Sequence, residues 1–332
     1  MSICIPTYNR ASYLKGVVEN IFSELEEYDN AGEVQIVIVD GKSQDNTTEV
    51  VDTLKAKAGA EIKYYRRDRK VGIDRDILKC IEIADGKYCW LFSDDDAFPA
   101  GAINHLVEIL KKNVDLTGCF CNRKSYDFSL RKEIAEAGAW AGKLIEGDRL
   151  FTDKAECFKC LGMDLGFISS QVVSRSRWQE AVEGADFKDL YSSYYLMVHV
   201  IAEMMNSSFK WMYIDRPLVM QRTANDSLLL RRGVMDRHNV EHNSFEKIVK
   251  LHFDADSEVY WAFFDKMVQR LPRVVANLKS QRVPYKTQCE LLKLYYSKYK
   301  RYHLFWGTVV PIFLVPNTVF VLVKKIYMKY LV

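Results

Sequence analysis

The sequence lacks several patterns that mark common enzyme classes. It contains no Gly-x-Gly-x-x-Gly segment and no Walker loop, which disfavours dinucleotide and ATP chemistry. Its six histidines form no ligand set, and His238 and His242 have no metalloprotease pattern between them, so we expect both at the surface. The Cys157-x-x-Cys160 pair has no matching second pair, which makes a zinc or redox site a poor interpretation.

The sequence also lacks the marks of a secreted chain. No basic stretch followed by an apolar signal core precedes the first apolar run, which begins at Ser2. The eight cysteines are scattered, mostly inside apolar runs, as buried free thiols are in a reducing compartment. We therefore expect a cytoplasmic protein.

Acidic residues are nearly missing from the last part of the chain. Residues 266–332 hold 13 Lys or Arg but a single acid, Glu290, although the whole chain has a net charge of only +3. Tyr, Phe and Trp are interleaved with these basic residues. This mixture favours an anionic membrane surface over nucleic acid as the partner of the tail.

The end of the chain contains the longest uncharged run. Residues 304–323 are 20 residues without a charge, which is long enough to cross a bilayer, but Gly307, Pro311 and Pro316 interrupt them. Basic residues lie on both sides of the run. We expect an interfacial segment over residues 304–332 that lies in the membrane surface, with a spanning helix or a soluble dimer surface as alternatives.

Apolar strands and amphipathic helices alternate over the first third of the chain. The expected strands are residues 2–6, 34–39, 62–65 and 88–92, and the expected helices are residues 11–28, 46–58, 75–84 and 99–112. Short connections between them predict a parallel, doubly wound sheet. Beyond residue 115 we expect strands at 119–121, 167–173 and 211–220 and helices at 191–205, 237–253, 257–280 and 285–302, with a last segment from 316.

One apolar run ends abruptly in carboxylates. Residues 88–92 read as a buried strand, and Ser93, Asp94, Asp95 and Asp96 follow directly. The carboxyl end of such a strand is where α/β sheets bind ligands. Adjacent carboxylates repel one another, and Mg²⁺ or Mn²⁺ together with a diphosphate is a natural counterpart. The alternative is an acidic turn before the next helix, with Pro99 in its first turn.

Four motifs occur in a characteristic order, namely Pro6-Thr7-Tyr8-Asn9-Arg10, Val39-Asp40-Gly41-Lys42-Ser43, Gly72-Ile73-Asp74-Arg75-Asp76 and Ser93-Asp94-Asp95-Asp96. Together they resemble the GT-A glycosyltransferases of family 2 over about residues 1–115. A narrower resemblance, to the abequosyltransferase type of O-antigen and capsule enzymes, adds Tyr88-Cys89-Trp90, Arg216-Pro217-Leu218-Val219 and Asn225-Asp226-Ser227.

The resemblance implies a nucleotide-sugar donor and assigns roles at the first two motifs. Pro6 and Tyr8 would line the base pocket, Tyr8 by stacking, and Asp40 would accept hydrogen bonds from the base. Arg75 would hold the diphosphate, unless it pairs with the neighbouring acids of its helix. Gly41 replaces a frequent second Asp of the family, so one acidic contact is missing.

The remaining roles lie at the acidic motif and after the last strand. Asp94 would bind the ribose, Asp95 would bind Mn²⁺ or Mg²⁺, and Asp96 would assist the metal or the acceptor. Ser93 stands where the family usually has its first Asp. In the polar loop expected to close over the donor, Arg222 would reach the diphosphate or lie at the surface.

The catalytic base is less clearly marked. An acceptor hydroxyl must lose its proton, and the acids Asp186 and Asp189 are the candidate bases, although acids before a helix are commonly caps. The Glu-Asp motif of the family is not recognisable in this chain, which leaves the base and the stereochemical outcome open.

The sequence therefore predicts a metal-dependent glycosyltransferase that is peripheral on the inner face of the cell membrane. Its acceptor would be an oligosaccharide on a polyprenyl diphosphate, in bacterial surface polysaccharide synthesis. The predicted domains are a GT-A domain at 1–230, with a nucleotide-binding half at 1–115 and an acceptor half at 116–230, a helical region at 231–303, and the membrane segment. The alternatives are a nucleotidyltransferase, whose glycine-rich triphosphate loop is missing, and a non-catalytic glycan- or lipid-binding protein on a degenerate scaffold.

Overall fold

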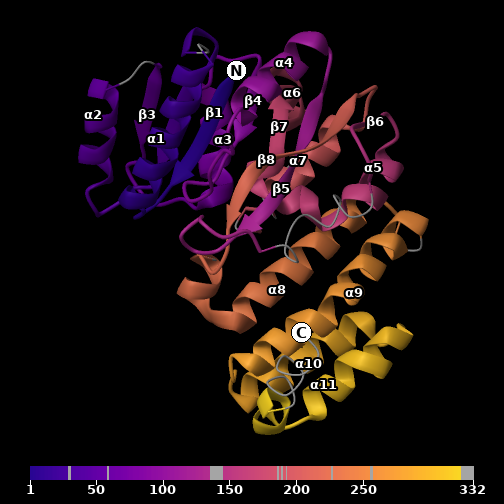
Figure 1. Cartoon of the computed structure of the whole chain (residues 1–332). Coiled ribbons are helices and arrows are strands. Elements are labelled where there is room, and N and C mark those ends of the chain that lie inside the picture. Colours follow the sequence, from indigo (N-terminus) through magenta and orange to yellow (C-terminus); the bar gives the residue numbers. More distant parts are fainter. Residues whose placement is uncertain are drawn as a thin grey trace. The chain divides into compact units, whose positions relative to one another are not determined.

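A computed structural model describes residues 1–28, 31–57, 60–134, 145–184, 187, 190–191, 193–225, 227–254 and 257–322. The chain divides into two compact units, Met1–Asn225 and Asp226–Val332. The first unit is mixed α/β and the second is helical (Figure 1).

An eight-stranded sheet forms the centre of the first unit. Its strands are β1 (Ser2–Thr7), β2 (Gln35–Asp40), β3 (Ile62–Arg66), β4 (Tyr88–Leu91), β5 (Gly118–Tyr126), β6 (Arg149–Phe151), β7 (Gln171–Ser174) and β8 (Trp211–Arg222). They lie in the order β3-β2-β1-β4-β7-β5-β8-β6. The pairs among β1 to β4 and the β5–β8 pair are parallel, whereas β7 and β6 pair antiparallel with their neighbours. The predicted α/β class with a mostly parallel sheet is confirmed.

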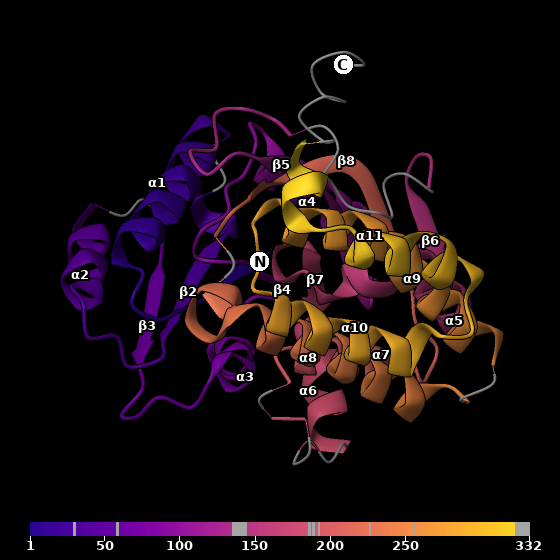
Figure 2. The same ribbon diagram turned by 90° about the horizontal axis from the view of Figure 1, so that it is seen from below.

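Helices cover both faces of this sheet. On one face lie α1 (Ala11–Glu27), α2 (Thr47–Lys57) and α4 (Ala102–Lys112), and on the other lie α3 (Ile73–Ile83), α6 (Arg175–Gly184) and α7 (Leu196–Met204) (Figure 2). The short α5 (Lys154–Leu161) contacts β6. Every second strand residue faces α1 and α4, as period-2 alternation requires. The buried side chains of that layer include Ile3, Ile5, Ile36, Ile38, Trp90, Phe92, Leu14, Val18, Ile103 and Leu106.

The strand order reverses next to β1. The chain moves outward from β1 through β2 to β3, and β4 then pairs with the opposite side of β1. The carboxyl ends of β1 and β4 therefore flank a topological switch point, where open α/β sheets bind their ligands.

Several predicted elements of the second half differ in extent from the structure, and two of them have a clear physical reason. The strand expected at 167–173 covers only Gln171–Ser174, because 3₁₀ turns occupy Gly162–Gly166 and Ile168–Ser170. The helix expected at 191–205 begins at Leu196, since Tyr194 has a φ of 63° that no α-helix accommodates. The Asp74 carboxylate accepts hydrogen bonds from the Tyr194 and Leu196 amides and so caps the start of α7.

The second unit is built from α8 (Ser227–His252), α9 (Glu258–Ser280), α10 (Tyr285–Tyr299) and α11 (Val310–Leu314). Gly233, with a φ of 83°, breaks the regular geometry of α8. Contrary to the sequence-based expectation, His242 is buried, because its helix face packs on α10, and its Nδ1 lies 2.6 Å from the Tyr299 hydroxyl. Burial lowers the pKa of His242 to about 3, so the imidazole is neutral.

The uncharged run near the end of the chain is interrupted in the structure as in the sequence. It contains a π-helical turn at Phe305–Val309 and then α11, after which Val315 is extended. Across the part of the chain that the structure describes, no helix combines the length and the apolar character needed to cross a bilayer.

Close packing around β5 generates a prediction about stability. A Cβ added at Gly118 would lie 2.3 Å from Cζ3 of Trp211 and 2.6 Å from the Val172 carbonyl oxygen. We expect Gly118→Ala to lower the free energy of unfolding by about 1–3 kcal/mol in urea titrations, because a buried backbone carbonyl cannot move aside cheaply. Gly16→Ala in α1 is the matched control, since its Cβ meets nothing within 4 Å; it should be neutral or stabilising. Equal midpoints for Gly118→Ala and the wild type would contradict this packing.

Candidate active site

Three buried carboxylates follow β4 at the switch point. Asp94, Asp95 and Asp96 are 4%, 8% and 3% exposed. The Thr7 hydroxyl, at the end of β1, donates to Asp94 Oδ2 over 2.8 Å. The loop after β1 and the loop after β4 therefore meet at the carboxyl edge of the sheet, where the sequence predicted a site.

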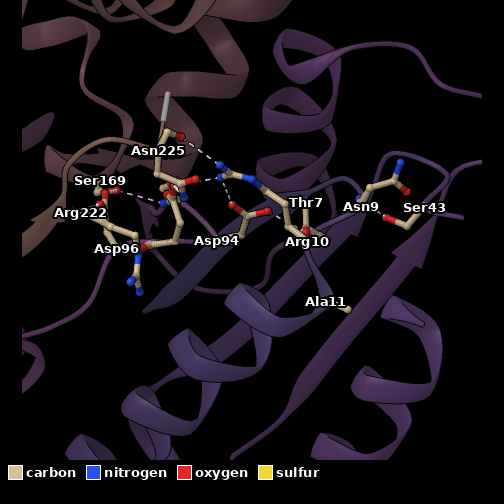
Figure 3. Close-up of polar contacts among 12 residues, drawn as sticks. Thr7, Asn9, Arg10, Ala11, Ser43, Asp94, Asp96, Ser169, Arg222 and Asn225 are labelled. Atoms are coloured by element: carbon tan, nitrogen blue, oxygen red, sulfur yellow. Dashed lines mark hydrogen bonds and ion pairs between the residues drawn. The ribbon is translucent and has the colours of Figure 1, made fainter. Parts of the chain in front are cut away.

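A single guanidinium bridges two of these carboxylates. Arg10 Nη1 lies 2.8 Å from Asp94 Oδ1 and 2.9 Å from Asp95 Oδ2. Arg10 Nη2 donates to the Asn225 carbonyl over 3.0 Å, and Figure 3 shows the Arg10 side chain between Asp94 and Asn225. The two charge-assisted ion pairs join the loops after β1 and β4, and the hydrogen bond to Asn225 adds a third chain segment.

Asp95 has further donors on both oxygens. The Asn225 side-chain amide donates to Oδ2 over 2.6 Å, and the Ser93 hydroxyl donates to Oδ1. Ser93 therefore serves as a hydrogen-bond donor in this site.

Asp96 is held by the opposite half of the sheet. Its Oδ2 accepts from the Ser169 hydroxyl over 2.6 Å, and its Oδ1 accepts from the Arg222 amide over 2.9 Å (Figure 3). Burial, reinforced by the charge of Asp95, raises the pKa of Asp96 to about 7. Burial also raises the pKa of Asp94 to about 6, although Arg10 opposes that shift.

The Arg222 side chain, at the end of β8, lies against this cluster. Its Nε donates to the Asp95 carbonyl over 2.7 Å and its Nη1 donates to the Phe128 carbonyl. Its guanidinium carbon lies 5.3 Å from the centroid of the Tyr13 ring. Arg222 therefore lies at the carboxylate cluster, and its role at the diphosphate stays a prediction.

Asp40, at the end of β2, is fully buried and already bonded. Its Oδ1 accepts from the Ser43 amide over 2.6 Å, and its Oδ2 accepts from the Tyr64 hydroxyl over 2.9 Å. Arg66 Nε lies 3.4 Å from the same Oδ2. Oδ2 therefore has two partners within the described part of the protein and Oδ1 has one.

The other predicted nucleotide-binding residues lie around the same edge. Pro6 is buried within β1 opposite Val39, whereas Tyr8 is partly exposed and carries the Lys70 ammonium 3.8 Å from its ring centroid. Arg75 is exposed, with its guanidinium 4.3 Å from the ring centroid of Tyr191.

The candidate bases Asp186 and Asp189 lie outside the described residues. Their roles stay predictions.

Sequence reasoning missed four polar residues of the cluster, namely Thr7, Arg10, Ser169 and Asn225. Thr7, Arg10 and Asn225 belong to motifs that were noticed, but a motif does not show which side chain faces the carboxylates. Ser169 lies in a segment predicted to be a plain strand, and nothing in its sequence context marks it.

The cluster has the carboxylate oxygens that a divalent metal site needs, but these oxygens already have partners within the protein. Carboxylate oxygens are the preferred ligands of Mg²⁺ and Mn²⁺. In this structure each oxygen of Asp94 and Asp95 faces a protein donor, and the Arg10 guanidinium supplies the positive charge. A metal on Asp95 does not fit this arrangement unless Arg10 leaves it.

Comparison with known proteins gives concordant findings. Residues 2–164 match the family described as "Glycosyl transferase family 2". Abequosyltransferase RfbV of Salmonella typhimurium is 26% identical over 288 residues, which are 84% of this chain and 83% of that protein.

Solved structures show the same fold. S. aureus TarS 1-349, also solved in complex with UDP and with UDP-GlcNAc, superimposes with a TM-score of 0.58 and 13% identity over 98% of this chain and 91% of that chain. The mannosyltransferase PcManGT from Pyrobaculum calidifontis, solved with GDP-Man and Mn²⁺, gives a TM-score of 0.53 and 14% identity over 99% of this chain and 87% of that chain.

The Arg10 bridge predicts how the cluster responds to a free metal ion. Arg10→Gln removes the cation that lies on Asp94 and Asp95, so we expect Mn²⁺ to bind at least about tenfold more tightly, in the absence of nucleotide, than it binds the wild type. Electron paramagnetic resonance of free Mn²⁺ measures this affinity directly.

The matched control for this experiment is Arg216→Gln, since Arg216 is exposed and donates to the Ala100 carbonyl. It should leave Mn²⁺ affinity unchanged. Equal affinities for Arg10→Gln and the wild type would show that Arg10 does not compete with a metal.

Proposed function

Given that the chain carries a glycosyl transferase family 2 domain over residues 2–164 and is a glycosyltransferase, we propose that it transfers a sugar from a nucleotide-sugar donor to an oligosaccharide acceptor. The observation that carries this proposal is the convergence of Thr7 and Arg10 after β1 with the carboxylates Asp94 to Asp96 after β4. Solved structural neighbours that hold UDP-GlcNAc and GDP-Man support a nucleotide-sugar donor.

In this proposal the nucleotide lies along the carboxyl ends of β1, β2 and β4. The base stacks on Tyr8, whose ring is partly exposed beside the Lys70 ammonium. Pro6 and Asp40 form the floor beneath it, and the ribose lies near Asp94. Asp40 orders this floor because it holds both the Ser43 amide and the Tyr64 hydroxyl. Asp40 is also the proposed acceptor of a hydrogen bond from the base.

The departing nucleoside diphosphate needs positive charge, since negative charge grows on it as the glycosidic bond breaks. Fixed cations near that charge stabilise the transition state. Arg10 and Arg222 lie at the carboxylate cluster, and Arg75 is exposed in the first turn of α3. We propose that these three guanidiniums provide the diphosphate site.

A divalent ion remains part of the proposal as a predicted cofactor. GT-A enzymes commonly use a divalent metal, and the mannosyltransferase neighbour was solved with Mn²⁺. The ion proposed for Asp95, Mn²⁺ or Mg²⁺, would supply additional positive charge at the diphosphate. Because Arg10 lies on Asp95 in this structure, no step of the reaction is assigned to the ion.

The acceptor hydroxyl must transfer its proton to a base as it attacks the anomeric carbon. Asp186 and Asp189 are the proposed bases, and Asp96 is the proposed helper next to the acceptor. A catalytic base works best when its pKa is close to the operating pH. Burial raises the pKa of Asp96 to about 7, which suits a group that shares a proton with the acceptor.

We propose that the acceptor is carried on a polyprenyl diphosphate at the cytoplasmic leaflet, as in O-antigen synthesis. The similarity to an abequosyltransferase supports this choice. The second unit adds a surface suited to anionic lipid, where Trp306, Leu314 and Leu322 are 51%, 73% and 59% exposed. Lys300 and Arg301 are exposed close to Trp306 in sequence, and the Trp306 indole donates to the Lys300 carbonyl over 2.8 Å.

The test of the proposed activity starts by screening UDP-, dTDP-, GDP- and CDP-sugars for release of the nucleoside diphosphate. With the active donor, one of Asp186→Asn and Asp189→Asn should lower kcat about 100-fold or more, because a missing base removes that much catalysis. Nucleotide affinity should stay unchanged. Glu183→Gln, at a neighbouring exposed acid, is the control and should retain full activity.

Full activity in both aspartate variants would place the base elsewhere. Failure of every nucleotide sugar to react or bind would instead favour the non-catalytic glycan- or lipid-binding protein.

The lipid surface generates a separate prediction. The double variant Trp306→Ser and Leu314→Ser should bind vesicles of phosphatidylcholine with phosphatidylglycerol at least about tenfold more weakly than the wild type, because two exposed apolar side chains no longer enter the interface. Co-sedimentation measures the bound fraction. Val114→Ser, at a residue 60% exposed in the first unit, should bind like the wild type. Unchanged binding of the double variant would rule out this surface as the contact.

A further inference from the structure

A second buried carboxylate lies near Asp40, contributed by the first turn of α3. Asp76 is 5% exposed, and its Oδ1 accepts a hydrogen bond from Arg67 Nε over 3.0 Å. Among the described residues, no donor lies within hydrogen-bonding distance of its Oδ2. One oxygen of this carboxylate is therefore satisfied by the protein, and the other is available.

Gly41 leaves room for the available oxygen. A Cβ on residue 41 would lie 2.9 Å from Asp76 Oδ2 and 3.6 Å from Cδ2 of Tyr8. Any side chain at this position would collide with the carboxylate, so the glycine leaves the space that Asp76 occupies. Asp76 thus supplies the second acid that Gly41 itself lacks, beside the ring proposed to stack on the base.

Asp76 and Asp40 differ in what they can offer a ligand. Ser43, Tyr64 and Arg66 already surround the Asp40 carboxylate. Burial raises the pKa of Asp76 to about 6; Arg67 opposes that shift, and the charge of Asp40 adds to it. A hydrogen bond from a ligand to this charged oxygen would contribute more than one between neutral groups.

We propose that Asp76 Oδ2 accepts a hydrogen bond from an N–H group of the nucleobase and is the residue that selects the base of the donor. This inference rests on the proposed function, because it requires a nucleotide at the carboxyl edge of β1 and β2. Arg67 acts as the positioning residue, since its Nε fixes Oδ1 and its Nη2 donates to the Arg75 carbonyl over 2.6 Å.

The arrangement makes Asp76→Asn an informative change. Arg67 only donates hydrogen bonds, so the amide oxygen must turn toward Arg67 and the amide NH₂ must take the place of Oδ2. The NH₂ group of the variant would then face the N–H group of the base, so two hydrogen-bond donors would meet. The side chain keeps nearly the same shape. Asp68→Asn is the matched control, because Asp68 is an exposed acid of the preceding loop.

The experiment is a calorimetric measurement of Kd for UDP, dTDP, GDP, CDP and ADP with the wild type and both variants. These ligands share the diphosphate, so differences in their ranking report on the base. We expect Asp76→Asn to raise the Kd of the preferred nucleotide at least about tenfold and to change the ranking of the five nucleotides. Asp68→Asn should keep the wild-type Kd values.

Two results would overturn the inference in distinguishable ways. If the wild type binds a preferred nucleotide and Asp76→Asn keeps the same ranking, Asp76 does not select the base and the proposed function stands. If the wild type binds none of the five, the proposed function fails and the inference fails with it. A circular dichroism melting curve for Asp76→Asn shows that the variant is folded in either case.

Discussion

The site depends on one guanidinium that forms ion pairs with two buried carboxylates. Three consecutive aspartates withdrawn from water would repel one another strongly, and an isolated buried charge is costly. Arg10 lies within 2.9 Å of both Asp94 and Asp95, and it also binds the carbonyl of Asn225. The loops after β1, β4 and β8 are joined through this side chain. Arg10 therefore offsets part of the repulsion within the cluster.

The sequence was sufficient to predict that carboxylates lie at the carboxyl edge of the sheet. It was not sufficient to predict which residues bind them. An apolar run that stops at Asp94 predicts carboxylates at a strand end, and short connections predict parallel strands, because both signals are local. The partners of those carboxylates are not local. Asn225 lies 130 positions from Asp95, and Ser169 lies 73 positions from Asp96. Such contacts depend on how β7 and β8 cross the sheet, which periodicity does not reveal.

Other differences have equally physical causes. Asp40 has partners that its motif does not reveal, because the turn that follows β2 places the Ser43 amide on it and β3 brings Tyr64. His242 was expected at the surface, since its neighbours in sequence are polar, yet the packing of α10 buries it. In the sequence, Gly41 indicated a missing acidic contact. In the structure, the carboxylate of Asp76 from α3 fills the space that the glycine leaves. In each case the tertiary neighbour, and not the residue itself, decides the outcome.

We propose that the carboxyl edge has two parts, a base side at Tyr8 and Asp76 and a diphosphate side at Arg10 and Asp94 to Asp96. A crystal structure of the wild type with its preferred nucleoside diphosphate tests this division most directly. It should show the base on the Tyr8 ring and the diphosphate at the carboxyl ends of β1 and β4. A nucleotide bound anywhere else on the chain would contradict the account.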